Sequence, residues 1–581
     1  MANGAGGRKR LWTLVGAEVW RRVRRRLRAG PKYRWRFSGR SPERVLVAPP
    51  DLRLADPQIA HEIYSGRYPL SGHMVETGGQ SPFQIAVADR GWLKSLHGFR
   101  WLRHMHAADT DLATANARAL VSDWIAVHGG SIEGVAWEPG TVAKRLVAWL
   151  QHSSLLLQGA ELRFYRSFLR SLAVQARYLR WAVHGMPDSK EKLRARIALA
   201  FAALSLPASA SSLRAVTRQL GEELNRQILP DGGHVSRNPL TIMELLADLL
   251  PLRQTYTNQA ERPPDELVAA VDRMLPALRF FRHRDGSIGR FNGMGATIQD
   301  RMSAILRHDD TGAAPLLHAP YSGYDRLELG ETVVIADTGP APPTELSRAA
   351  NAGCLSFEMS SGRRLIVVNC GIDTYGPVEA RPLGRSTAAH STATLNDTSQ
   401  ARFNHGKRVA ALVGQPLLGG ALNVSCQRTD TAESQSFVAS QDAYLSRFGL
   451  YHEREVKLSD GGRMLVGIDR FYKPAGSPPL AGDRDAIAIR FHLHPDVELS
   501  GDPRSPFLDV PDGARWQFAS PDIAPVLEET IFFAGLAGPR RSRQIVLVGR
   551  VSDIPAVRWL FRQRVRKSQG FRRQPPGCRG L

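Results

Sequence analysis

The order of two hydrophobic patterns is the feature that most constrains the fold of this chain. Between about residues 85 and 310, apolar side chains recur every three or four positions, which indicates amphipathic helices. From about residue 320, short β-rich runs alternate with glycine-containing turns, as in antiparallel sheets. The helices are expected at 111–127, 141–152, 161–183, 190–203, 212–227, 240–250 and 264–280, and the strands at 332–337, 354–359, 364–369, 393–395, 436–439, 453–457, 464–472, 486–492, 516–519 and 544–551.

Helices followed by strands predict segregated layers instead of a parallel α/β sheet. The short connections between helices favour an α/α toroid or a helical array, and the absence of a fixed repeat disfavours a solenoid. A chain of 581 residues also exceeds a single core. We therefore predict an α+β multidomain protein with a toroid at 85–315 and an antiparallel β-sandwich at 320–557. A basic segment with an amphipathic helix (1–75) and a basic tail (558–581) flank them.

The positive charge is concentrated at the two ends of the chain. Residues 1–50 contain 14 Lys/Arg and 2 Asp/Glu, and residues 558–581 contain 8 Lys/Arg and no acid. These ends carry +20 of the formal +22, so the body between them is nearly neutral. Nucleic-acid enzymes usually spread basic surface over the folded domain, which disfavours nucleic acid as the partner.

The first helix combines aliphatic and aromatic side chains at helical spacing with a cluster of arginines at its end. Its apolar residues include Trp12, Val19, Trp20, Val23 and Leu27. Three interpretations stay open: a solvated helix packed on the body, contact with an anionic membrane surface, or binding of a polyanion.

Cysteine usage and the first residues bear on localisation. Four cysteines without a C-x-x-C pair indicate free thiols in a reducing compartment. We expect no signal peptide, because the chain becomes basic after 11–15, and no apolar run reaches bilayer length. The cytoplasm or the inner-membrane periphery is expected, with the periplasm left open.

Three local motifs carry a resemblance to a known family. They are Asp231-Gly232-Gly233-His234 continuing to Pro239, Ala352-Gly353-Cys354-Leu355-Ser356-Phe357-Glu358, and Arg385-Ser386-Thr387-Ala388-Ala389-His390-Ser391-Thr392. In this order they resemble the heparinase II/III family of polysaccharide lyases, and in particular its alphaproteobacterial-type branch. The resemblance implies a helical toroid followed by a β-sandwich, with substrate bound in the cleft between them.

β-Elimination from a uronate needs a group that neutralises the carboxylate, a base and an acid. The resemblance implies catalytic roles for His234 and His390 on opposite sides of the cleft. Arg237 and Asn238 would contact the carboxylate at a helix N-terminus, a favourable place for an anion. The substrate-binding candidates are Arg237, Asn238, Asn369 and Tyr375, the last as a replacement for the family's tyrosine.

The same alignment shows departures from the family pattern. Thr241 and Ile242 stand where relatives have Tyr-His, and Ala349, Asn351 and Gly353 stand where they have His-x-His-x-Asp. Asn369 replaces a zinc-binding aspartate, so only His390 matches a zinc ligand. One histidine with two amides is a poor zinc site, because zinc prefers imidazole, thiolate and carboxylate. No cofactor is therefore required, zinc is a disfavoured alternative, and the metal ligands stay unassigned.

The sequence supports two main functional hypotheses. The first is a carbon–oxygen lyase that cleaves an acidic, uronate-containing glycan by β-elimination. The alternative is a catalytically impaired, glycan-binding relative that its basic tails localise. The identity of the glycan does not follow from the sequence.

Overall fold

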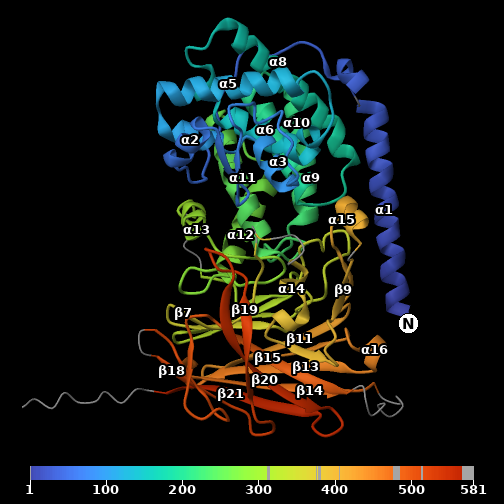
Figure 1. Cartoon of the computed structure of the whole chain (residues 1–581), viewed down its shortest axis with the longest axis vertical. Coiled ribbons are helices and arrows are strands. Elements are labelled where there is room, and N and C mark those ends of the chain that lie inside the picture. Colours follow the sequence, from blue (N-terminus) through green and yellow to red (C-terminus); the bar gives the residue numbers. More distant parts are fainter. Residues whose placement is uncertain are drawn as a thin grey trace, which may run out of the picture.

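The computed structural model describes residues 2–564 apart from 30, 310–313, 374–375, 377–380, 405, 475–484 and 512–513. It has a helical half and a β half stacked end to end (Figure 1). Within the described residues, no helix is both long and apolar enough to cross a bilayer.

The helical half forms because apolar faces at helical spacing pack into one core. All seven helices expected here are present, and apart from the end of α11 their ends are shifted by at most a few residues. They are α5 (Asp111–His128), α6 (Pro139–Gln151), α8 (Leu162–Ala182), α9 (Lys190–Ser205), α10 (Ala210–Gln227), α11 (Pro239–Asn258) and α12 (Asp265–Phe280). The prediction that ended α11 at residue 250 was wrong. The helix continues through Pro251 because Leu252, Thr255 and Tyr256 are buried beyond it, and this packing outweighs the lost backbone hydrogen bond.

The first 76 residues are more ordered than a basic tail. Helix α1 (Ala2–Ala29) runs alongside both halves of the molecule and packs on α15 (Lys407–Val413) and β10 (Leu417–Gly419) of the β half (Figure 1). After α1 in the chain, helix α2 (Pro57–Tyr64) and the hairpin of β1 (Arg67–Leu70) and β2 (His73–Glu76) cover part of the helical core.

The β half contains two large antiparallel sheets. One has the order β19-β20-β15-β7-β6-β5-β4-β3 with β8 paired to β15, and the other has the order β11-β12-β13-β14-β21-β18-β17-β16. The first consists of β3 (His318–Ala319), β4 (Tyr324–Leu329), β5 (Thr332–Asp337), β6 (Phe357–Ser361), β7 (Arg364–Val368), β8 (Ala393–Leu395), β15 (Ala486–Leu493), β19 (Val526–Phe532) and β20 (Arg540–Arg550). The second consists of β11 (Val424–Asp430), β12 (Gln435–Gln441), β13 (Tyr451–Ser459), β14 (Met464–Tyr472), β16 (Glu498–Ser500), β17 (Phe507–Asp509), β18 (Arg515–Ala519) and β21 (Ala556–Arg564).

A shared aromatic core joins the two sheets. Phe357 of β6 stacks on Trp559 of β21 with ring centroids 5.5 Å apart. Beside them, the buried guanidinium of Arg454 pairs with Asp469 and donates to the carbonyl oxygens of Leu355 and Ser391, each at 2.8 Å. This buried ion pair therefore fixes the loops that precede β6 and β8.

The predicted architecture of an α/α toroid followed by an antiparallel β-sandwich is confirmed. One expected boundary needs correction. The basic tail was expected to begin at 558, but β21 continues to Arg564 because Val557, Trp559 and Phe561 alternate into the sandwich core.

Candidate functional site

The turn before α11 carries three of the residues selected from sequence. Asn238 is the N-cap of α11, and its Oδ1 accepts a hydrogen bond from the Leu240 amide at 2.9 Å, with Pro239 in the first turn. Asp231 accepts from the amide and the hydroxyl of Ser322 in the β half. The turn is therefore both a helix start and part of the junction between the two halves.

His234 is buried, and both of its ring nitrogens have partners. The Ser236 amide donates to Nδ1 at 3.0 Å, which places the proton on Nε2, and Nε2 lies 2.9 Å from Oε1 of Gln227. Burial lowers the pKa of His234 to about 3, so the ring is neutral. The imidazole thus connects the turn to the end of α10.

Arg237 fastens the turn to the first sheet. Its side chain forms an ion pair with Asp337 and donates to the carbonyl oxygens of Ser322 and Gly323, each at 2.7 Å, and of Pro340 at 2.6 Å. The ion pair raises the pKa of Arg237 further against the effect of burial. Every donor direction of the guanidinium is used within the protein, so the observed contacts make Arg237 a joint between the two halves.

His390 lies in the β half, in the loop before β8. Its Nδ1 donates to the Ser386 carbonyl oxygen at 2.7 Å, whereas its buried Nε2 has no hydrogen-bond partner among the described residues. Burial lowers the pKa of His390 to about 4. Gly353 lies directly against the ring, since a Cβ atom there would be 2.6 Å from Cδ2 of His390. The structure thus brings together residues from two of the three motifs that carry the family resemblance.

Asn369 and Asn351 extend this buried polar cluster. Oδ1 of Asn369 accepts from the Ser391 amide at 3.0 Å, and its Nδ2 has no partner among the described residues. Both amide atoms of the Asn351 side chain are also buried and have no partner in the part of the chain that the structure describes. His390, Asn369 and Asn351 therefore keep hydrogen-bonding capacity that no described protein atom uses.

The residues present do not fit a zinc ion. Of the three candidate ligands, only His390 Nε2 is a donor type that zinc favours, and the amide oxygen of Asn369 already accepts a hydrogen bond. The nearby carboxylate of Glu358 is held by Arg290, His283 and the Asn369 amide. Among the described residues, no group of three or more His, Cys, Asp or Glu side chains could hold a metal ion.

Two buried residues at the junction were not selected from sequence. Tyr324 donates to the carbonyl oxygen of Arg237, and Asn292 donates to both Tyr324 Oη and Asp337. The backbone amide of Asn351 in turn donates to Oδ1 of Asn292. No local motif marks these positions, because their importance arises from a contact between segments far apart in sequence. Tyr375, the remaining candidate, lies outside the described residues.

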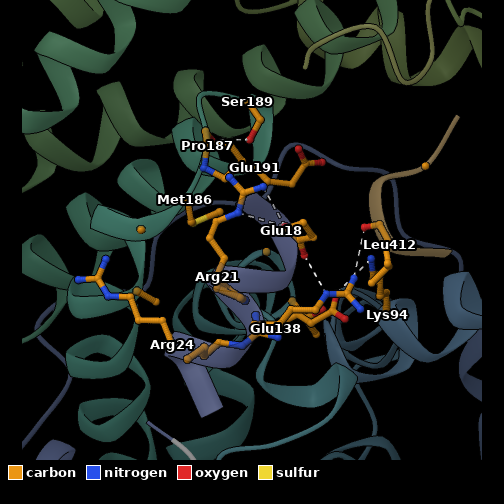
Figure 2. Close-up of a pocket in the computed structure, with 18 of the residues that line it drawn as sticks. Glu18, Arg21, Arg24, Lys94, Glu138, Met186, Pro187, Ser189, Glu191 and Leu412 are labelled. Atoms are coloured by element: carbon orange, nitrogen blue, oxygen red, sulfur yellow. Dashed lines mark hydrogen bonds and ion pairs between the residues drawn. The ribbon is translucent and has the colours of Figure 1, made fainter. Parts of the chain in front are cut away.

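A cavity of about 630 Å³ lies between α1 and the two halves of the molecule (Figure 2). Its walls come from α1, from α6, from the segment that joins α8 to α9, and from α15. Figure 2 shows Arg21 extending from α1 toward Met186, Pro187 and Ser189. None of the five described site residues selected from sequence lines this cavity.

The cavity is strongly basic. Eight Lys/Arg side chains and three glutamates line it. Glu18 pairs with Arg21 and Arg22 of the same helix, and Arg22 donates to the Leu412 carbonyl oxygen at 3.3 Å. Glu138 pairs with Arg90 and Lys94 on the opposite wall. The cavity therefore keeps an excess of positive charge after its own ion pairs are formed.

Comparisons with known proteins agree with this architecture. Residues 311–560 match the family model described as heparinase II/III-like, C-terminal. FtsZ-localized protein C of Caulobacter vibrioides (strain NA1000 / CB15N) is 31% identical over 568 residues, which cover 96% of each chain. A crystal structure of heparinase III superposes with a TM-score of 0.71 at 13% identity, covering 91% of this chain and 88% of that one. A mutant of heparan sulfate lyase HepC from Pedobacter heparinus gives 0.62 at 18% identity, covering 92% and 87%.

Proposed function

Because this chain belongs to the heparinase II/III-like family, we propose that it uses the family's two-domain fold to bind an acidic glycan at a membrane surface without cleaving it. This proposal rests on the burial and hydrogen bonding of His234, which was expected to transfer protons, and on the replacement of family residues at other positions. His234 is buried with both ring nitrogens occupied, and Thr241, Ala349 and Gly353 replace side chains on which the family's chemistry depends.

The outer face of α1 supports the membrane part of the proposal. Trp12 is 63% exposed, and Val19, Val23 and Leu27 are exposed on the same side of the helix. Arg8, Lys9, Arg26 and Arg28 are exposed beside this apolar stripe, whereas Trp20 and Arg24 are exposed but also line the cavity under α1. Apolar and aromatic side chains flanked by arginines suit the interface of an anionic bilayer, where the rings enter the headgroup region and the cations meet lipid phosphates.

The relative from Caulobacter vibrioides supports a location. Its name describes a protein localised by FtsZ, and the identity extends over nearly the whole of both chains. We extend that location to this chain, so that its membrane-facing helix and its glycan-binding body would act where FtsZ is present.

Elimination with a substituted site is the second candidate, which would make the protein a carbon–oxygen lyase. The unpaired Nε2 of His390 favours it, because a buried imidazole nitrogen without a partner can accept a proton from a ligand that reaches it. The elimination product absorbs ultraviolet light, so the two candidates differ in a direct measurement.

Co-sedimentation with vesicles tests the membrane proposal. Full-length protein should sediment with vesicles of phosphatidylcholine containing about a third phosphatidylglycerol, and much less with phosphatidylcholine alone. The variant Trp12→Ser/Val23→Ser should bind at least ten-fold more weakly. Leu112→Ser/Leu162→Ser, which removes exposed apolar side chains from the helical half, is the matched control. Equal binding by both variants would refute the role of α1.

An elimination assay tests the absence of cleavage. Purified protein is incubated with a panel of uronate polysaccharides while absorbance near the unsaturated-uronate band is followed. We expect a flat trace from folded protein that still retains a glycan on an affinity column. A rising signal that is lost in His390→Ala would replace the proposal with the lyase function.

A further inference from the structure

Four basic side chains that line the cavity under α1, namely Arg24, Arg25, Lys144 and Arg348, have no counter-ion among the described residues. Arg25, Lys144 and Arg348 come from α1, α6 and the β half respectively, and none forms an ion pair or side-chain hydrogen bond with a described residue. The third glutamate of the cavity, Glu191, neutralises Lys144 only in part, because its carboxylate also faces Lys190 and Arg194 of α9. Cations gathered from three separate elements around one space indicate a site for an anion.

The lowered pKa of Lys144 agrees with a binding site for an anion at this wall. Burial and the neighbouring guanidinium groups of Arg194 and Arg100 lower the pKa of Lys144 to about 7, although Glu244 and Glu191 act in the opposite direction. Lys144 also lines a second cavity of about 510 Å³ that shares Lys94 with the first. A negatively charged ligand in either cavity would restore the charge of this ammonium group.

The remaining walls indicate what else the ligand carries. Trp181, Met186 and Pro187 provide an apolar surface, and Thr141 and Ser189 provide hydroxyl groups. A volume of about 630 Å³ lies within the range of small-molecule sites, which combine apolar walls with a few polar groups that set orientation. A sugar ring with hydroxyl groups and a charged substituent matches this combination.

We propose that the cavity under α1 binds an acidic saccharide, whose phosphate or carboxylate group lies among Arg25, Lys144 and Arg348. The proposal rests on the glycan-binding part of the proposed function and assigns it to a site separate from His234 and His390. A ligand held by these three residues would connect α1, the helical half and the β half, and would thereby fix α1 against the body.

Isothermal titration calorimetry with the full-length protein tests this site. The probes are a hexose phosphate, a uronic-acid disaccharide, a neutral disaccharide and inorganic phosphate. Lys144→Gln and Arg348→Gln should each weaken binding of the acidic saccharide at least ten-fold. Arg26→Gln is the matched control, because Arg26 is on the same helix as Arg25 but does not line the cavity, and it should change affinity less than two-fold.

The outcomes separate the sources of charge and the two proposals. Binding of the hexose phosphate alone assigns phosphate, and binding of the uronate alone assigns carboxylate; both support the site. Equal binding of the neutral disaccharide or of inorganic phosphate would overturn an acidic saccharide as the ligand. Binding that is unchanged in both cavity variants, or absent from folded wild-type protein at millimolar probe, would overturn the site. Vesicle binding by the two cavity variants, Lys144→Gln and Arg348→Gln, reports separately on the membrane proposal, since neither alters the apolar stripe of α1 or the arginines beside it.

Discussion

Replacing Lys144 with methionine should make the protein more stable near neutral pH. The side chain of Lys144 reaches a cavity wall where burial, Arg194 and Arg100 disfavour its charged form, and its pKa falls from 10.5 to about 7. Methionine has a similar length and carries no charge that must be buried. The substitution therefore removes an unfavourable charge from the folded state and leaves the unfolded state almost unchanged.

The magnitude follows from the difference in proton binding between the two states. The folded pKa of Lys144 is depressed, so between about pH 7 and 10.5 the unfolded chain binds more protons at this site and stability rises with pH. At about 1.4 kcal/mol per pKa unit, the full shift destabilises the wild type by roughly 4 kcal/mol at pH 7 and roughly 2 kcal/mol at pH 9. Water that enters the cavity screens these charges, so we expect about half of each value.

Thermal unfolding of wild type and Lys144→Met at several pH values between 7 and 9 measures this effect. The melting temperature of the variant should exceed that of the wild type at pH 7, and the gap should narrow by pH 9. Lys94→Met is the matched control, because Lys94 lines the same cavities but pairs with Glu138. The electrostatic explanation for Lys144 would be refuted if the variant melted below the wild type at pH 7. It would also be refuted if the difference in melting temperature did not change with pH.

Two further substitutions test the junction between the halves and the packing around His390. Arg237→Met should lower the free energy of unfolding by about 3–5 kcal/mol, because it leaves the buried Asp337 carboxylate and several carbonyl oxygens unpaired. Chemical denaturation beside the exposed control Arg262→Met measures this, and a wild-type midpoint would contradict the structural role of Arg237. Gly353→Ala should cost about 1–3 kcal/mol, because its Cβ would lie 2.6 Å from His390. Gly130→Ala, with open space around it, is the control, and equal melting temperatures for the two variants would show that His390 moves freely.

The fold could be predicted from sequence because its signals are local. Helical spacing located α5, α6 and α8 to within a few residues, and turn residues separated the strands of the β half. The end of α11 was missed because a proline usually ends a helix, whereas here the buried side chains beyond Pro251 keep it helical. Tertiary packing of this kind has no local signature.

The site was less predictable, because sequence position does not report burial. The motif around His234 identified a real junction, and Asn238 lies at the helix N-terminus that was expected there. The sequence could not show that the hydrogen-bond donors of the Arg237 guanidinium are occupied by Asp337 and by backbone carbonyl groups more than 80 positions away. The cavity under α1 could not be predicted from the sequence either, since its cations come from separate segments that meet only in the folded chain.

The contacts that join the two halves come from residues other than those that depart from the family pattern. The two halves are joined by Asp231, Arg237, Tyr324 and Asp337, which bind one another or the backbone. The positions that depart from the family pattern, such as Thr241 and Gly353, contribute none of these joining side-chain contacts. The substitutions at these positions therefore leave the junction intact, so that α1 lies across both halves and closes a basic cavity that His234 and His390 do not line.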